Sequence, residues 1–322
     1  MVKTKKRLGF LNLIVIFGLL VIIFLSSAKA ALLIHDYKNP PIPEPPPEPV
    51  YPPVEAALGN GRTDGGIELY SGYVLLYDLD NDEVLYSRYP SVCTQPASLT
   101  KMMTVYTALQ YIDDVNAEIT IKYEDLAGLY EANASMAGFQ EGDTVPIKDL
   151  IYGTMLPSGA DAANALARAS CGSLDEFILK MNETAQSLGM KNSQFKNVTG
   201  LDSNGHYTTA DDLLILMKTA LKDDFFREVI CTDEYITVPT SYYTNGIKLK
   251  STLSAKFAMM QLERGPLLGG KTGYTERAGL CLASIASINE HEYLLITMGA
   301  DGDGKSPQTN LLDALNLYSR CK

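Results

Sequence analysis

The chain has 322 residues, of which 46% are hydrophobic and 20% are charged, so its composition is that of a globular protein. The 27 basic and 38 acidic residues give a formal net charge of −11, which argues against nucleic-acid binding because phosphate contacts need lysine and arginine. The three histidines lie far apart and the five cysteines form no CxxC pair, so we expect no metal and no other cofactor. The odd number of cysteines leaves at least one unpaired, and any disulfide pairing stays open.

The N-terminus has the features of an export signal. Four basic residues within positions 3–7 precede an apolar run from Leu8 to Leu25, and Ala28-Lys29-Ala30 has the form of a signal-peptidase site. The run of 18 residues is long for a signal peptide and just long enough to span a bilayer. Residues 1–30 are therefore expected to be a cleaved signal peptide or a retained membrane anchor. In both cases the remainder is extracytoplasmic, either in the cell envelope or secreted.

A proline-rich stretch, 39–53, follows this segment. Dense proline favours polyproline II, a stiff extended conformation, so residues 31–64 are expected to form a linker or stalk. A ligand for a proline-recognising domain is the alternative reading. Glycines at positions 59, 61, 65 and 66 mark the start of the folded part, which is expected to span residues 65–322.

The folded part begins with a predicted hairpin of strands at Gly72–Leu79 and Glu83–Tyr89, separated by an Asp-Asn-Asp turn. Helices are predicted at about Ser98–Ile112, 147–156, 160–170, 173–188 and 209–222. Strands follow at Leu267–Tyr274, Leu280–Ile288 and Tyr293–Gly299, with a last helix at about Gln308–Ser319. This order predicts an α+β fold in which both chain ends build one antiparallel sheet around an inserted helical subdomain.

Three short motifs carry candidate chemistry. Ser98 and Lys101 lie three residues apart and share a helix face, so the lysine amine is placed to activate the serine hydroxyl. Ser158-Gly159-Ala160 precedes an alanine-rich helix, where Ser158 is either an N-cap or an exposed hydroxyl facing Ser98. Lys271-Thr272-Gly273 lies on a predicted strand, where a lysine and a hydroxyl suit a carboxylate ligand.

The third motif also fits a phosphate-binding P-loop, because residues 265–272 match G-x-x-x-x-G-K-[ST]. A P-loop needs a strand before the loop and a helix that starts at its Lys-Thr pair. The residues before Gly265 are a poor strand, and Gly273 and Gly279 interrupt any helix after Thr272. We therefore expect no nucleotide site here.

The motifs S-x-x-K, S-x-x and K-T-G occur in this order in serine β-lactamases and penicillin-binding proteins. The chain resembles the D-alanyl-D-alanine carboxypeptidases of peptidase family S11 over roughly residues 70–300. The strings that carry the resemblance are Pro96-Ala-Ser-Leu-Thr-Lys-Met-Met103, Leu156-Pro-Ser-Gly-Ala-Asp-Ala-Ala163, Phe195-Lys-Asn-Val-Thr-Gly-Leu-Asp202 and Gly270-Lys-Thr-Gly-Tyr-Thr275. The resemblance implies a β-lactamase/transpeptidase-like fold, peptidoglycan stem peptides as substrate and β-lactams as covalent inhibitors.

The resemblance also implies a role for each motif residue. Ser98 would attack the carbonyl between two D-alanines, Lys101 would take its proton, and Ser158 would relay a proton to the leaving amine. Lys271 and Thr272 would hold the terminal carboxylate, and Gly273 and Tyr274 would also belong to the substrate-binding strand. The backbone N–H groups of Ser98 and Tyr274 would form an oxyanion hole.

The sequence departs from the family at the second motif, where Ala160 stands in place of an asparagine. Whether Asn164, one helical turn later, supplies the missing amide stays open. A class A β-lactamase would need an S-D-N second motif and a loop glutamate, and residues 190–202 contain no glutamate. A catalytically inactive wall-binding module and an endopeptidase for cross-linked peptides also stay open.

Overall fold

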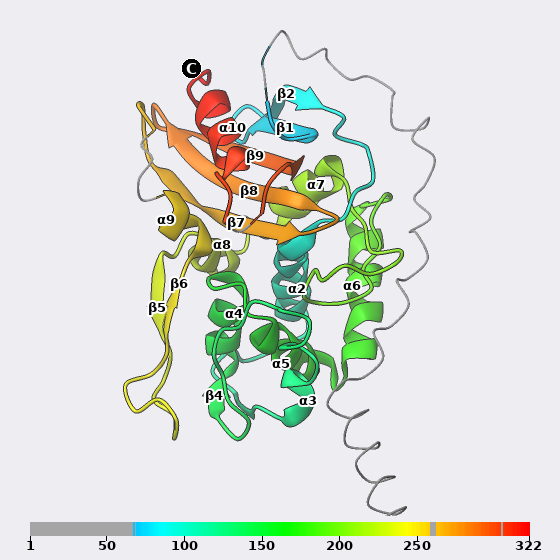
Figure 1. Cartoon of the computed structure of the whole chain (residues 1–322), viewed down its shortest axis with the longest axis vertical. Helices are drawn as coiled ribbons and strands as arrows, with labels where there is room; N and C mark the ends of the chain where they lie inside the picture. Colours follow the sequence, from blue (N-terminus) through cyan, green and yellow to red (C-terminus); the bar gives the residue numbers. More distant parts are fainter. Residues whose placement is uncertain (1–66, 68, 258–261, 304) are drawn as a thin grey trace, which may run out of the picture. The chain divides into compact units, whose positions relative to one another are not determined.

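The computed structural model, which describes Ile67 and residues 69–257, 262–303 and 305–322, contains a five-stranded antiparallel sheet with strand order β2-β1-β9-β8-β7 (Figure 1). Strands β1 (Tyr73–Asp78) and β2 (Glu83–Arg88) form the predicted N-terminal hairpin. Strands β7 (Leu267–Thr275), β8 (Gly279–Ile288) and β9 (His291–Ala300) come from the other end of the chain, and β9 pairs with β1. The predicted sheet built from both chain ends is therefore confirmed.

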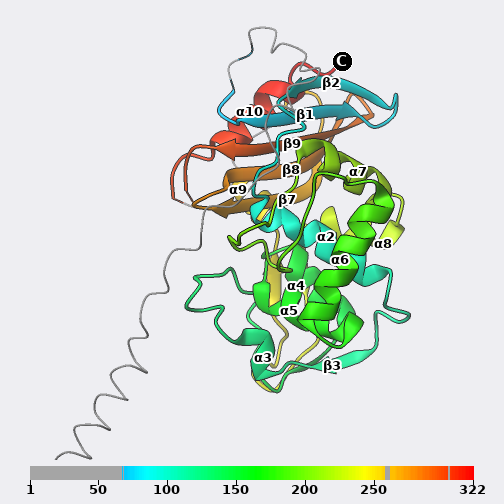
Figure 2. The same cartoon turned by 90° about the vertical axis from the view of Figure 1, so that its right-hand side faces the viewer.

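The alternation of side chains along β1 divides the core into two layers. Leu75 and Tyr77 pack into a large cluster with the helical block, and Val74 and Leu76 pack into a second cluster with the C-terminal helix α10 (Thr309–Tyr318). Figure 2 shows the strands stacked above the helical block in the turned view. The sheet therefore has apolar cover on both faces.

The helical block surrounds a central helix. The elements of this block are η2 (Ala97–Leu99), α2 (Thr100–Leu109), α3 (Tyr123–Leu126), α4 (Ile147–Met155), α5 (Ala160–Cys171), α6 (Leu174–Leu188), α7 (Ala210–Ala220), α8 (Asp224–Ile230) and α9 (Thr252–Phe257). The central helix is α2. Every residue of α2 from Thr100 to Ala108 is buried, which is typical of a helix enclosed on all sides. The α-helix is shorter than the predicted Ser98–Ile112, because its start is a 3₁₀ turn that contains Ser98.

Two small antiparallel sheets were not predicted. One joins β3 (Glu118–Thr120) to β4 (Thr144–Pro146), and the other joins β5 (Glu234–Ile236) to β6 (Lys248–Lys250). The β5–β6 hairpin lies beside α4 in Figure 1. It leads directly into Thr252, whose N–H donates to the Leu156 carbonyl at 3.0 Å, and so it fixes α9 beside the loop after α4.

Several sequence features fall outside this core. Residues 1–30 and 31–64, expected to be a signal or anchor and a linker, lie outside the described residues. Among the helices that are described, none combines the length and the apolar character needed to cross a bilayer.

All five cysteines are free, and Cys281 and Cys321 are buried, so the cysteines are thiols and form no disulfide in this structure.

Candidate functional site

Ser98 lies in a strained turn at the start of α2. The preceding Ala97 has φ +48°, a left-handed conformation that residues other than glycine rarely adopt. The Thr100 hydroxyl donates to the Ala97 carbonyl at 2.8 Å, and the Leu99 N–H donates to the Pro96 carbonyl at 3.1 Å. These local bonds hold Ser98 in a fixed orientation at the end of a buried helix, and backbone strain of this kind is typical of functional sites.

Lys101 contacts Ser98 from the next turn. Its Nζ lies 3.2 Å from Ser98 Oγ and donates to the Thr199 carbonyl at 2.6 Å. Burial lowers the pKa of Lys101 from 10.5 to about 7, and the nearby Asp161 opposes this shift. At neutral pH a large fraction of Lys101 is therefore neutral and can accept the Ser98 proton.

Ser158 lies in the loop between α4 and α5 and has φ +65°. The residue is only 4% exposed, so the hydroxyl is buried and not exposed as predicted, and its Oγ has no hydrogen-bond partner among the described residues. The N-cap reading is wrong, because Gly159 is the N-cap residue of α5 and no side chain caps that helix. A buried hydroxyl without a partner costs about 1–3 kcal/mol, so it is a group that a bound substrate or water can satisfy.

A buried carboxylate supports the Ser158 loop. Asp161 accepts hydrogen bonds from the backbone N–H groups of Ala137, Gly138 and Phe139 at 2.7, 2.9 and 3.1 Å. Burial raises the pKa of Asp161, and these hydrogen bonds oppose the shift. The Ala160 N–H also donates to the Ser135 carbonyl at 2.7 Å. Residues 135–139 are therefore fixed against the second motif.

Asn164 does not replace the missing family asparagine. Its amide donates to the Asp125 carbonyl of α3 at 3.0 Å. That contact lies on the side of α5 that packs on α3, and the same face carries the Arg168–Asp125 ion pair at 2.6 Å. The side chain at the third position of the second motif is thus a methyl group, and the Asn164 amide is hydrogen-bonded to Asp125 instead.

Lys271 is a second buried lysine, on the edge strand β7. It is fully buried, and its Nζ donates to the Thr272 carbonyl at 2.8 Å. Burial holds the pKa of Lys271 well below its usual range, and the charges of Lys101 and Lys256 lower it further. A bound anion would reverse these effects, which suits a carboxylate ligand. The Thr272 hydroxyl lies 2.7 Å from the Thr252 hydroxyl of α9, which fixes its direction.

Gly273 brings β7 against the Ser98 turn. A Cβ at this position would lie 2.9 Å from the Ser98 nitrogen and 3.0 Å from the Ala97 Cβ, so a side chain does not fit without a shift. Tyr274 follows on the same strand and is 37% exposed. Because Leu267–Thr275 is a continuous strand paired with β8, the structure also contradicts the P-loop reading.

Residues of the segment 195–206 contact the Ser98–Lys101 pair and its supports, and the three motifs do not indicate these contacts. The Lys196 N–H donates to His206 Nδ1 at 3.1 Å, so the His206 Nε2–H donates to the Thr100 hydroxyl at 2.8 Å. Burial lowers the pKa of His206 to about 3, so this imidazole is neutral and supports the Ser98 turn through Thr100. Thr199 holds Lys101 through its carbonyl, and a backbone contact of this kind leaves no signal in a sequence pattern.

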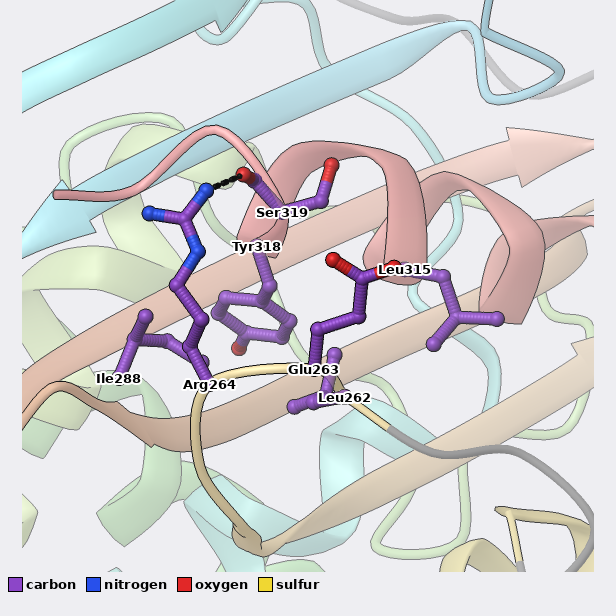
Figure 3. A pocket seen from close by; sticks show the side chains of 7 residues that line it. All are labelled: Leu262, Glu263, Arg264, Ile288, Leu315, Tyr318 and Ser319. Carbon is purple, nitrogen blue, oxygen red and sulfur yellow. Dashed lines mark hydrogen bonds between the residues drawn. The ribbon is translucent and has the colours of Figure 1, made fainter.

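Two further observations concern parts of the described structure outside this site. No group of three or more His, Cys, Asp or Glu side chains suited to a metal ion occurs among the residues that are described. A cavity of about 150 Å³ lies beside α10, where Leu262, Arg264 and Tyr318 are among its lining residues (Figure 3). None of the predicted site residues lines that cavity.

Comparison with known proteins shows which family and which solved structures the chain resembles. The sequence model of the D-alanyl-D-alanine carboxypeptidase family, peptidase S11, matches residues 61–302. The carboxypeptidase DacF of Bacillus subtilis is 32% identical over 78% of this chain and 62% of its own length. The carboxypeptidase DacA of Escherichia coli is 31% identical over 70% of this chain and 55% of its own length. The chain thus spans little more than half the length of these relatives.

The solved structures include the Streptomyces K15 DD-transpeptidase, which superposes with a TM-score of 0.69 at 25% identity. The match covers 79% of this chain and 98% of that chain. It confirms the predicted β-lactamase/transpeptidase-like fold.

Proposed function

Because the chain belongs to the D-alanyl-D-alanine carboxypeptidase family, we propose that it removes the terminal D-alanine from peptidoglycan stem pentapeptides. The proposal rests above all on one observation: the amine of the buried Lys101 lies 3.2 Å from the Ser98 hydroxyl. Burial also lowers the pKa of Lys101 to about 7. A general base works best when its pKa lies near the working pH. The pair therefore suits acyl transfer at neutral pH.

In the proposed reaction Ser98 Oγ forms a bond to the carbonyl carbon between the two D-alanines, and its proton passes to Lys101. The carbonyl π electrons move to the oxygen, which the Ser98 and Tyr274 N–H groups stabilise, at about 2.7–4 kcal/mol per donor in comparable enzymes. When the C–N bond breaks, the leaving amine takes a proton through Ser158. Water then hydrolyses the acyl-enzyme.

Substrate binding is assigned to strand β7. Lys271 and Thr272 would hold the terminal carboxylate, and the absence of a side chain at Gly273 lets the strand approach Ser98 closely. β-Lactams carry a carboxylate and a strained amide, so we propose that they acylate Ser98 in the same way.

The proposed location is the cell envelope. Residues 65–322 would form the peptidase domain, 31–64 a linker, and 1–30 either a cleaved signal or an anchor that uses the apolar run 8–25. The position of the basic residues before this run supports a peptidase domain outside the membrane.

Covalent labelling with a fluorescent penicillin tests the proposal, together with mass analysis of a pentapeptide that ends in D-Ala-D-Ala. We expect labelling and release of one D-alanine by the wild type, and neither by Ser98→Ala. Equal labelling of both proteins, or of neither, would favour a wall-binding module without catalysis. Rapid nitrocefin turnover would instead favour a β-lactamase, and cleavage of cross-linked peptides alone would favour an endopeptidase.

A further inference from the structure

Asn197 organises a turn that faces Lys101. Its Oδ1 accepts hydrogen bonds from the Thr199 N–H at 3.1 Å, the Thr199 hydroxyl at 3.2 Å and the Gly200 N–H at 2.7 Å. Its Nδ2 donates to the Leu201 carbonyl at 2.9 Å. Because one side chain satisfies polar groups of three successive residues, it sets the direction in which the Thr199 carbonyl points.

The turn formed by residues 197–201 also packs against the turn that contains Ser98. Gly200 has φ +83°, and a Cβ there would lie 1.9 Å from the Ala97 carbonyl oxygen. On the α2 side, the Thr104 hydroxyl donates to the Val198 carbonyl at 2.8 Å. The turn therefore contacts both ends of the Ser98–Lys101 pair and has little room to move.

The Thr199 carbonyl can only accept, so it always engages an N–H of Lys101, at a distance of 2.6 Å. A neutral amine has two N–H bonds and one lone pair. When the carbonyl fixes one N–H, rotation about the Cε–Nζ bond is restricted. The lone pair can then be held toward Ser98 Oγ, 3.2 Å away.

We propose that Asn197 is a positioning residue for acylation: through the Thr199 carbonyl it orients the Lys101 amine toward the Ser98 hydroxyl. The inference rests on the proposed function. In the step concerned, the Ser98 O–H bond breaks while Oγ bonds to the substrate carbonyl carbon. The proton joins the Lys101 lone pair, and the carbonyl π electrons move to oxygen.

The test compares Asn197→Ala with a matched control, Asn182→Ala. Asn182 is also an asparagine that binds this segment, since its Oδ1 accepts from the Phe195 N–H at 2.8 Å and its Nδ2 donates to the Phe195 carbonyl at 2.9 Å. The hydrogen bonds of Asn182 go to Ile178 and Phe195, and among the described residues none reaches the turn that faces Lys101. Stopped-flow labelling with a fluorescent penicillin separates binding of the inhibitor from the acylation rate constant, and thermal unfolding reports stability.

For Asn197→Ala we expect the acylation rate constant to fall by about ten- to a hundredfold while inhibitor binding is unchanged, since small misplacements of reacting groups have effects of that order. Asn182→Ala should acylate within about twofold of wild type even where its stability falls. Asn197→Asp keeps the acceptor oxygen for the Thr199 and Gly200 N–H groups but loses the donor to the Leu201 carbonyl, so it should be faster than Asn197→Ala and slower than wild type. Asn197→Gln shifts the amide by one methylene and should be slow, which provides the test if Asn197→Ala does not fold.

The outcomes separate the two proposals. If the wild type does not label, the proposed function fails and the role of Asn197 fails with it. If the wild type labels and Ser98→Ala does not, the function stands. Acylation of Asn197→Ala or Asn197→Gln at the wild-type rate, or an equal loss in Asn182→Ala, would then overturn the positioning role alone.

Discussion

Two buried lysines from distant parts of the chain differ in what surrounds them. Lys101 lies beside Ser98 and the Thr199 carbonyl, and it has a carboxylate, Asp161, close enough to oppose the effect of burial on its pKa. Lys271 instead lies near two other cations, Lys101 and Lys256, whose charges lower its pKa further. Burial favours the neutral amine in both, but an anionic ligand is needed to favour the charged form of Lys271. This difference suits one lysine to proton transfer and the other to carboxylate binding.

The pKa of Lys101 makes a pH-dependent prediction. The neutral amine is the base, so acylation by a fluorescent penicillin should fall as pH drops below about 7, by about tenfold per pH unit well below the pKa. Lys101→Ala should abolish acylation. Lys101→Arg is the control that retains a long cationic side chain, and it should be equally inactive because a guanidinium stays protonated. A wild-type rate that is constant from about pH 5 to 9, or normal penicilloyl adducts on Lys101→Ala by mass spectrometry, would contradict the assignment.

At the scale of elements, the site depends on the contact between β7 and the 3₁₀ turn η2. A Cβ added at Gly273 would lie 2.9 Å from the Ser98 nitrogen. Gly270, with φ +152°, lets the same strand pass close to β8, where a Cβ would lie 2.2 Å from the Ala283 carbonyl oxygen. Glycines therefore allow the strand that carries Lys271 to lie directly against the turn that carries Ser98.

This contact makes Gly273→Ala informative. The added methyl would displace the Ser98 turn, so we expect the acylation rate to fall by about tenfold or more while the sheet still forms. Gly72→Ala is the control, because its Cβ would meet its nearest neighbour, the Gly299 carbonyl, at an ordinary 3.6 Å. Acylation kinetics and thermal unfolding of both variants provide the measurement. Equal rates for the two variants would mean that the β7–η2 contact does not set the geometry.

The elements also show how far the sequence could predict this structure. The helices at 160–170 and 173–188 were predicted to within one residue of α5 and α6, because an amphipathic pattern of that length is distinctive. The strands β3 and β5 have three residues each, too few to show a period. The motifs predict Ser98 as the nucleophile, but they do not reveal that the carbonyl of Thr199 holds Lys101, since any residue supplies a carbonyl.

At the scale of the whole folded part, Ile67 and residues 69–71 connect the hairpin β1–β2 to the C-terminal helix α10. The Arg88 guanidinium donates to the carbonyls of Ile67, Leu69 and Ser71 at 3.1, 3.2 and 3.4 Å. The buried Asp313 of α10 accepts from the Tyr70 and Ser71 N–H groups at 2.9 and 2.7 Å. Ile67 and residues 69–71 are therefore part of the fold, and the domain boundary near residue 65 stays a prediction.

Two truncations test this boundary. A chain that begins at residue 65 should keep the thermal midpoint and acylation rate of the full chain, because the contacts of Ile67 and residues 69–71 remain. A chain that begins at residue 73 lacks the two N–H donors of Asp313, whose side chain is 1% exposed, and should lose at least about 1–3 kcal/mol of unfolding free energy in urea titrations. Asp313→Ala in the longer chain should reproduce part of that loss, because it removes the same hydrogen bonds while the chain keeps its length. Equal stability of the two truncated chains would place the boundary after residue 72, and loss of acylation in the longer one would mean that residues 1–64 contribute to the site.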